Sequence, residues 1–347
     1  MIKYADVGVD IEEEAEAVSA ISKSIIETFK NREGKIGRVL EEFGHFSGLL
    51  DMGEFALAIT TDGVGSKVLV SQEAGKFDTV GIDLVAMNVN DIICNGAEPV
   101  AMVNYIAVQK PNPRIMYEIG KGLEKGARES GIAIVGGETA TLPEIIKGKD
   151  GKGFDLAGTC IGIVKKENII TGKDIKEGDV VLGIESSGIH SNGLTLARKV
   201  FEEKGFDYKI PNGKSVKEEL LTPTRIYVKP VLQILKELDI HGLAHITGGG
   251  LLKLKRIGKI AKLGFILDNL PEPQPIFKEI QRLGNVSNVE MYKTFNMGIG
   301  FCIVLDEGES PRAIEIIEGY GFKAKIIGKA VKEEGCKVKL PSLGIEI

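Results

Sequence analysis

Segments with the period of a β-strand alternate with segments with the period of an α-helix, and this restricts the chain to folds that pack helices on sheets. Residues 55–62 (FALAITTD) alternate apolar and polar side chains, and the run at 155–166 is rich in strand-forming residues. Between them, residues 78–99 and 113–131 are helix-like, and residues 100–108 are again strand-like. The first half of the chain is therefore predicted to mix strands and helices.

A polar stretch at residues 165–179 (KKENIITGKDIKEGD) is the best candidate for a domain boundary. At 347 residues, the chain has the length of about two domains. We therefore expect an α+β protein with an N-terminal mixed α/β domain over residues 1–166 and a C-terminal α/β domain over residues 167–347.

The second half is also predicted to combine helices and strands. Residues 191–205 and 222–238 are helix-like, and residues 295–331 read as strand, helix and strand. In the second helix, Pro223 suits the first turn, where its missing N–H is not needed, and Pro230 is expected to kink the helix.

The charge balance and the cysteines exclude several classes of protein. A formal net charge of −5 argues against a general binder of nucleic acid or of membrane surfaces, which would need a basic field. The four cysteines, at 94, 160, 302 and 336, match no zinc-site spacing and are expected to be reduced thiols. No apolar run approaches the ~18 residues of a spanning helix. We expect a cytoplasmic protein without nucleic-acid or membrane partners.

A glycine-rich loop that carries an acid, TTDGVGSK at residues 60–67, follows the first predicted strand. It is not a P-loop, because that motif ends in Gly-Lys-Ser/Thr, whereas Ser66 here separates Gly65 from Lys67. Asp62 would repel the phosphates of a nucleotide unless a cation neutralised them. We therefore predict that Asp62 holds a metal ion and that Lys67 adds a positive charge beside the phosphates.

Two further acids of the first half stand beside glycines or turns, Asp91 in NVNDIICNGAEP and Glu138 in IVGGETATLP. Taken singly, each acid is more simply explained as a helix cap or a turn residue. Taken together with Asp62, they suit Mg²⁺, which binds through a few carboxylates and the phosphates of a nucleotide.

Two glycine-bearing turns of the second half each precede a predicted helix and each contain a histidine, His190 in SSGIHSNG and His245 in AHITGGG. The free N–H groups of a helix start can hold an anion such as a phosphate. Each histidine is a candidate general acid or base, and the alternative is that it shapes its turn through hydrogen bonds to the backbone. Asn296 also has two possible roles: it could bind a substrate, or it could form hydrogen bonds with buried backbone groups.

The motifs, taken in order, resemble those of the phosphoribosylformylglycinamidine cyclo-ligase family, or aminoimidazole ribonucleotide synthetases, over almost the whole chain. The matching motifs are YADVGVDI, TTDGVGSK, TVGIDLVAMNVNDIICNGAEPV, VGGETATLP, FDLAGTCIGIV, GIHSNGLTLARK, LLTPTRIYVKPV, HITGGGL and MYKTFNMGIGF. The acidic motifs alone would fit a wider superfamily, and GIHSNG, TPTRIYVK and MYKTFNMGIG point to this family.

The resemblance implies ATP-dependent ring closure of formylglycinamidine ribonucleotide in purine synthesis, with ATP and Mg²⁺ bound. It also implies a homodimer in which a four-stranded sheet of each N-terminal domain joins a barrel shared across the dimer. The alternative function is that of another ATP-dependent synthetase or kinase of the same superfamily. Selenophosphate synthetase is disfavoured because no cysteine precedes Cys94.

Site residues follow from the resemblance and from the chemistry of the turns. Expected around the nucleotide are Asp62, Gly63, Gly65, Lys67, Asp91, Gly136, Gly137 and Glu138, with Asp62, Asp91 and Glu138 on the metal. Expected around the substrate are Ser191, Asn192, Thr247, Gly248, Gly249 and Asn296. Expected in catalysis are His190 for proton transfer, His245 as the second candidate, and Lys67.

The chain departs from the family pattern near its N-terminus. Glu41 and Glu42 stand where family members often have small residues, so the loop over ATP is expected to close differently. A lysine of the N-terminal helix often points at the nucleotide in this family. Lys23 lies near that place, but its register leaves the assignment open.

Overall fold

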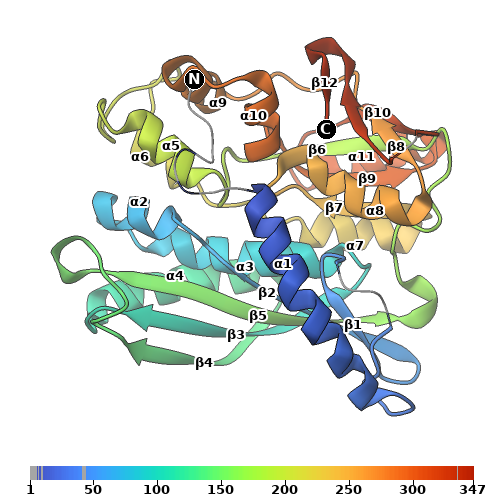
Figure 1. Ribbon diagram of the computed structural model, residues 1–347, viewed down its shortest axis with the longest axis horizontal. Coiled ribbons are helices and arrows are strands. Elements are labelled where there is room, and N and C mark those ends of the chain that lie inside the picture. The colour runs from blue at the N-terminus through green and yellow to red at the C-terminus, as the bar shows by residue number, and fades with distance from the viewer. Residues whose placement is uncertain (1–5, 7, 9–10, 41–43, 334) are drawn as a thin grey trace.

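The computed structural model describes residues 6, 8, 11–40, 44–333 and 335–347, and it contains two β-sheets with helices packed on them (Figure 1). Glu41, Glu42 and most of the YADVGVDI motif lie outside the described residues. The first half forms α1 (Ile11–Ile26), η2 (Glu27–Arg32), β1 (Gly48–Asp51), β2 (Phe55–Gly63), α2 (Lys67–Ala74), α3 (Asp78–Ile93), β3 (Glu98–Val108), α4 (Pro113–Ser130), β4 (Ala133–Thr141), η3 (Lys149–Gly151) and β5 (Phe154–Lys165).

The second half begins with η4 (Lys166–Asn168), β6 (Val180–Glu185), α5 (Leu194–Phe201), α6 (Val216–Leu220), α7 (Val228–Glu237), β7 (Ile240–His245), η5 (Gly250–Lys253) and α8 (Leu254–Ala261). It continues with β8 (Gly264–Ile266), α9 (Pro275–Gly284), α10 (Asn288–Thr294), β9 (Ile299–Leu305), η6 (Glu307–Glu309), α11 (Ser310–Gly319), β10 (Ala324–Val331), β11 (Val338–Leu340), η7 (Pro341–Leu343) and β12 (Ile345–Glu346). The mixed α/β character predicted for both halves is confirmed.

The first sheet has five strands in the order β1-β2-β5-β3-β4. The expected number of four is wrong, because the short β1 adds an edge strand by pairing with β2. β2 and β3 both run antiparallel to β5, whereas β3 and β4 are parallel. The β3–β4 register shifts by one residue between Met102 and Val103, so Val135 is an extra residue in β4.

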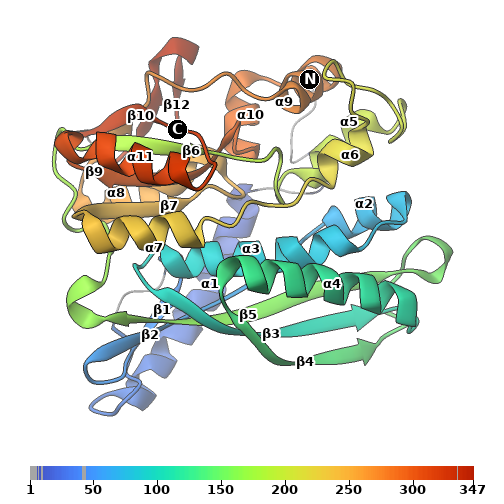
Figure 2. The same ribbon diagram turned by 180° about the vertical axis from the view of Figure 1, so that it is seen from behind.

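Helices α3 and α4 cover one face of the first sheet, and the second half of the chain lies beyond α3 (Figures 1 and 2). From Thr79 to Ile93, every residue of α3 except Asp91 is buried. A helix enclosed on all sides is apolar on all sides, which explains the nearly continuous hydrophobic sequence here. Asp91 is therefore the point at which this helix reaches a less enclosed space.

Helix α1 crosses in front of the first sheet in Figure 1, but its described side chains are exposed except for Ser22, so no described helix packs on the opposite face of this sheet as α3 and α4 do on the first. Five apolar side chains of its strands are between 38% and 44% exposed: Phe55, Ile59, Val103, Tyr105 and Ile163. We call these five residues the open face. Isolated exposed apolar residues are ordinary, but a group on one sheet face marks a contact surface.

The second sheet has seven strands in the order β12-β11-β8-β10-β6-β9-β7. β9 is buried along its whole length and pairs antiparallel with both β6 and β7. β7 is also fully buried and ends at His245, so this histidine lies at the boundary between the two halves. No helix in the described residues is both long enough and apolar enough to span a membrane.

Both proline predictions for residues 222–238 are wrong. α7 begins only at Val228, so Pro223 lies in the preceding loop, and Pro230 lies in the first turn of the helix. The first four N–H groups of a helix have no partner within it, so a proline there removes no hydrogen bond and causes no kink.

Candidate active site

Asp62 at the end of β2, Asp91 near the end of α3 and His245 at the end of β7 meet at the boundary between the two halves, and we call the place where they meet the cleft. Asp91 Oδ1 lies 2.8 Å from His245 Nδ1, and Asn90 Nδ2 lies 3.4 Å from His245 Nε2. An amide nitrogen only donates, so Nε2 accepts and Nδ1 carries the proton that His245 donates to Asp91. The His245 ring also stacks on Phe301 with centroids 6.3 Å apart, which fixes its orientation.

Asp62 faces the same space from the end of β2. Burial, and then the neighbouring charge of Asp91, raise its pKa to about 6, while the Gly63 N–H and the nearby His245 and Lys253 oppose the shift. Asp62 Oδ1 accepts a hydrogen bond of 2.7 Å from Gly63 N. A buried carboxylate beside a second negative charge is an environment that a bound cation would stabilise.

Lys253, which the sequence analysis did not single out, is the basic residue of this cleft. Burial, with a contribution from Arg256, lowers its pKa to about 8, and the charges of Asp91, Asp62 and Glu14 oppose the shift. It ends η5, three residues after Gly250, the last glycine of TGGG. Its position one turn after a glycine-rich helix start was a feature of the sequence from which this residue could have been predicted.

The two glycine turns of the second half meet each other and the TTDGVGSK loop. A Cβ placed on Gly248 would lie 2.9 Å from Asn192 Oδ1, and one placed on Gly65 would lie 3.9 Å from Ser191 O. Asn192 Nδ2 is buried, with no partner among the described residues. The turns also need glycine locally, because Gly193 has a φ of 74° and a Cβ there would meet the Phe295 ring.

Of the other residues predicted near the nucleotide and substrate, Thr247 belongs to the same turn, where its carbonyl accepts from Gly250 N at 2.8 Å. Gly63 is the last residue of β2 and pairs with Ala157. The structure thus brings together the predicted residues Asp62, Gly65, Asp91, Ser191, Asn192, His245 and the TGGG turn.

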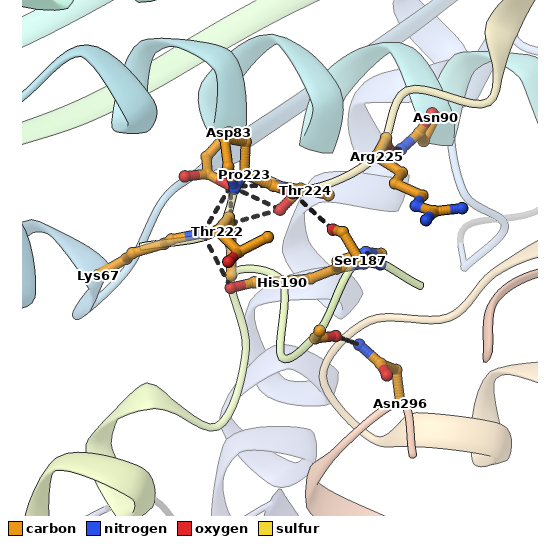
Figure 3. A network of polar contacts seen from close by, with 12 residues as sticks. Lys67, Asp83, Asn90, Ser187, His190, Thr222, Pro223, Thr224, Arg225 and Asn296 are labelled. Atoms are coloured by element: carbon orange, nitrogen blue, oxygen red, sulfur yellow. Dashed lines mark hydrogen bonds and ion pairs between the residues drawn. The ribbon is translucent and has the colours of Figure 1, made fainter. Parts of the chain in front are cut away.

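Lys67 is not in this cleft, and the prediction that it lies beside the phosphates is corrected. Its side chain is fully buried, and Nζ donates to Asp83 Oδ1 at 2.8 Å, Thr222 O at 2.8 Å and His190 O at 3.2 Å (Figure 3). An ammonium group has three N–H donors, so none remains for a phosphate.

His190 is also placed differently from the prediction that it transfers protons. Its ring is only 1% exposed, and burial lowers its pKa well below 6.5, so it is neutral at physiological pH. Its Nε2 atom accepts a hydrogen bond of 3.2 Å from Ser187 N. This bond agrees with the alternative expectation that the histidine shapes its turn. Its φ of 61° is left-handed, so the side chain and the backbone together define the turn.

Asn296 takes the second of the two roles left open for it. Its Oδ1 accepts from Ser186 Oγ at 3.0 Å and from Gly298 N at 2.9 Å, and its Nδ2 donates to Gly188 O at 2.9 Å. The side chain is 3% exposed. Asn296 therefore holds the turn that contains His190 and is not directed at a substrate.

Glu138 points to the open face of the first sheet, opposite to Asp62. It pairs with Tyr105, whereas Gly137 pairs with Asn104 on the helix-covered face. Asp62 lies three strands away across β5 and β3, about 14 Å at the usual strand spacing. In the described residues, no group of three His, Cys, Asp or Glu side chains could hold a metal ion. The predicted three-acid metal site is therefore not formed within one chain.

The described groups of the cleft combine two acids, which offer oxygen ligands, with the positive charge of Lys253. Phosphoryl transfer needs such positioning and charge neutralisation more than it needs covalent chemistry from the protein.

Two family models match the chain, one on each half. The model described as AIR synthase related protein, N-terminal domain, matches residues 44–164, and AIR synthase related protein, C-terminal domain, matches residues 176–341. The chain is 54% identical over 337 residues to a phosphoribosylformylglycinamidine cyclo-ligase of Methanocaldococcus jannaschii, covering 95% of this chain and 93% of the relative. It is 52% identical over 348 residues to that of Pyrococcus horikoshii, covering 100% of both.

Solved structures of lower identity share the fold. AaThiL complexed with AMPPCP and TMP superposes with a TM-score of 0.67 at 15% identity, covering 97% of this chain and 96% of that one. Hydrogenase maturation protein HypE in complex with ATP superposes with a TM-score of 0.62 at 20% identity, covering 89% and 85%. Identities this low establish a common architecture only.

Proposed function

The chain belongs to the phosphoribosylformylglycinamidine cyclo-ligase family, and from that premise we propose how its residues divide the work of the reaction. The enzyme uses ATP to close the imidazole ring of aminoimidazole ribonucleotide from formylglycinamidine ribonucleotide in purine biosynthesis. ATP phosphorylates the formamide oxygen, the amidine nitrogen attacks the activated carbon, and phosphate leaves. An amide oxygen is a poor leaving group, and phosphorylation makes it a good one.

Asp62 and Asp91 hold the Mg²⁺ that accompanies ATP in this proposal. Their fit is supported by the burial of Asp62 beside the charge of Asp91, which raises the pKa of Asp62, and by their being the hard oxygen donors that Mg²⁺ prefers. When bound, Mg²⁺ neutralises phosphate charge during phosphoryl transfer. Lys253 supplies the second positive charge, and the backbone of Gly63 and Gly65 borders the phosphates.

The glycine turns bind the ribonucleotide substrate. Ser191 and Asn192 approach it from one turn, and Thr247, Gly248 and Gly249 approach it from the other. The buried Nδ2 of Asn192, which has no partner among the described residues, supports this assignment because such a donor is costly to leave without an acceptor. His245 keeps Asp91 oriented through its 2.8 Å hydrogen bond and is the remaining candidate for proton transfer.

A second copy of the chain covers the open face and makes a homodimer. Glu138 borders a groove of about 400 Å³ on this face, together with Thr61, Tyr105 and Thr159. The role predicted for Glu138 at the nucleotide is therefore proposed at this subunit interface, where the sheets would join in a barrel, and the roles of its neighbours Gly136 and Gly137 stay proposals.

The bounds of the two domains and the location of the protein in the cell are also proposed. Residues 1–166 form the ATP-binding and dimerisation domain and residues 167–347 form the domain that completes the cleft, which agrees with the separate sheets of the two halves. The four cysteines are all unpaired, and this supports a cytoplasmic location, where thiols stay reduced.

The observation that carries the metal and nucleotide assignment is the burial of Asp62 close enough to Asp91 for the charge of Asp91 to raise its pKa. Asp62→Asn and Asp91→Asn should each lower turnover by roughly two orders of magnitude, because each removes charge stabilisation from phosphoryl transfer. Aminoimidazole ribonucleotide formation from formylglycinamidine ribonucleotide and ATP, followed over a Mg²⁺ titration, measures the effect. Asp207→Asn, at a side chain 87% exposed, is the control. Near-normal rates with normal Mg²⁺ dependence in both variants would contradict the assignment.

A further inference from the structure

A buried ion pair of the first half, Lys67 and Asp83, is hydrogen-bonded to two loops of the second half. Lys67 begins α2 and Asp83 lies in α3, and both side chains are 0% exposed. All the other partners of this pair come from two loops of the second half, residues 187–193 and residues 222–227 (Figure 3). We call the pair and these partners the interdomain clamp.

One carboxylate oxygen organises most of the clamp. Asp83 Oδ1 accepts from Thr224 N and Thr224 Oγ1, both at 2.7 Å, from Lys67 Nζ at 2.8 Å and from Ser191 Oγ at 3.2 Å. Ser191 Oγ and Thr224 Oγ1 are also 3.0 Å apart. Asp83 Oδ2 is buried and has no partner among the described residues, so these hydrogen bonds hold the carboxylate through Oδ1.

Lys67 ties the same two loops through their carbonyl groups. It donates to His190 O in the first loop and to Thr222 O in the second. His190 is in the left-handed region at a φ of 61°, a conformation that a non-glycine residue keeps only when its surroundings hold it. The ammonium group on its carbonyl is one such restraint.

The loops are also joined to each other and to α3 by neutral hydrogen bonds. Ser187 Oγ donates to Pro223 O at 2.6 Å. Asn90, two turns after Asp83 on α3, donates to Arg225 O at 2.8 Å and accepts from Tyr227 N at 2.9 Å. The second loop is thus fixed to α3 through Asp83 and Asn90. Asn90 directly precedes Asp91 on this helix.

A buried ion pair is a poor device for stability, because desolvation offsets most of the attraction and apolar residues of similar size often serve as well. What this pair does provide is a single arrangement of two loops relative to α3. Ser191 contacts Asp83 directly, and Asn192 follows it into the cleft. The geometry therefore couples the placement of the substrate turn to the helix that carries Asp91.

We propose that Lys67 and Asp83 are positioning residues for ring closure, which hold the Ser191–Asn192 turn in register with the Asp62–Asp91 site. The inference rests on the proposed function of that cleft. A loosened clamp leaves the ATP site intact but misplaces the substrate turn. ATP is then consumed without matched ring closure, because the phosphorylated intermediate is lost to water.

Thr224→Val tests the clamp with little risk to folding, since it removes one hydroxyl from Asp83 and conserves the shape of the side chain. Thr171→Val is the matched control, because the Thr171 hydroxyl accepts from Lys173 N and lies in neither loop of the clamp. We expect Thr224→Val to lower kcat for ring closure about tenfold, to leave the KM for ATP unchanged and to raise the ratio of ADP to aminoimidazole ribonucleotide above one. Thr171→Val should behave as the wild type.

The double variant Lys67→Met/Asp83→Asn separates positioning from direct phosphate binding. Each single variant leaves a buried charge without its partner, whereas the double variant removes both charges. If the pair positions the turns, the double variant regains at least tenfold in kcat/KM over Lys67→Met. If Lys67 binds phosphate, the losses multiply and the KM for ATP rises, which overturns the proposal. Unchanged kcat and stoichiometry in Thr224→Val also overturn it. A wild-type enzyme without ring-closing activity would instead refute the proposed function.

Discussion

At the scale of single residues, His190 shows how burial sets the charge of a side chain. Its folded-state pKa lies well below 6.5 because burial penalises the imidazolium form and the charges of His245, Lys67 and Arg225 add to this. The folded state thus binds fewer protons at this position than the unfolded state. A group with a depressed pKa contributes stability that is present above the unfolded pKa and is lost as the pH falls.

We predict that His190 contributes to acid destabilisation below pH ~6.5, by up to about 1.4 kcal/mol per pH unit. Urea unfolding of the wild type and of His190→Asn between pH 5 and pH 7.5 measures this. Asparagine tolerates the left-handed backbone, so the variant tests the ring and not the turn. The variant should be less stable at pH 7.5, through loss of the bond from Ser187 N, but its stability should fall less steeply toward pH 5. Parallel curves would contradict the prediction.

At the scale of elements, the contact between α3 and α4 depends on glycines. A Cβ added to Gly122 would lie 1.8 Å from Asp78 O, and one added to Gly81 would lie 2.4 Å from Ile119 O. Both obstacles are backbone atoms, which cannot move without shifting a helix. Because α3 carries Asp83, Asn90 and Asp91, its position against α4 also sets the position of the cleft.

We predict that Gly122→Ala lowers the free energy of unfolding by at least about 1–3 kcal/mol, the usual cost of overpacking, and lowers turnover with it. Gly120→Ala on the same helix is the matched control. Gly120 is exposed and a Cβ there would meet no atom within 4 Å, so alanine should stabilise the helix by about 0.5–1 kcal/mol. Denaturant unfolding compares the two. Equal effects of both substitutions would show that the helices do not pack this closely.

At the scale of the whole molecule, the open face is the surface that the chain leaves uncovered. Its five apolar side chains lie on neighbouring strands of the first sheet, opposite to α3 and α4. Covering such a face with an identical copy is the simplest way to remove it from water, since most soluble homo-oligomers are symmetric dimers.

We predict that light scattering at micromolar concentration gives twice the 37.4 kDa mass of one chain. Ile59→Lys, at the centre of the open face, should shift the mass toward that of one chain because it buries an unpaired charge in the interface. Tyr117→Lys, at a side chain 67% exposed on α4, is the control and should stay dimeric. A wild type of single-chain mass would remove the shared-barrel arrangement.

Local patterns in the sequence were enough to predict the family, the reaction, most of the elements and several residues that meet at the cleft, though not Lys253. These depend on local patterns: periodicity predicted β2, α3 and α4, and Asp62, Asp91 and the TGGG turn were found as acids or glycines beside strand and helix ends. Such features survive in any packing, because a loop at the end of a strand keeps its residues wherever the strand is placed.

The directions of three side chains, Glu138, Lys67 and His190, depend on packing between distant parts of the chain. The extra residue Val135 shifts the alternation in β4, so Glu138 faces the open side and not the side of Asp62. Lys67 is drawn into the protein by Asp83, His190 and Thr222, the last of which is 155 positions away in the sequence. His190 is buried for the same reason, in a turn held by Asn296. Contacts between residues so far apart leave no trace in a local pattern, because they form only when the two halves pack together.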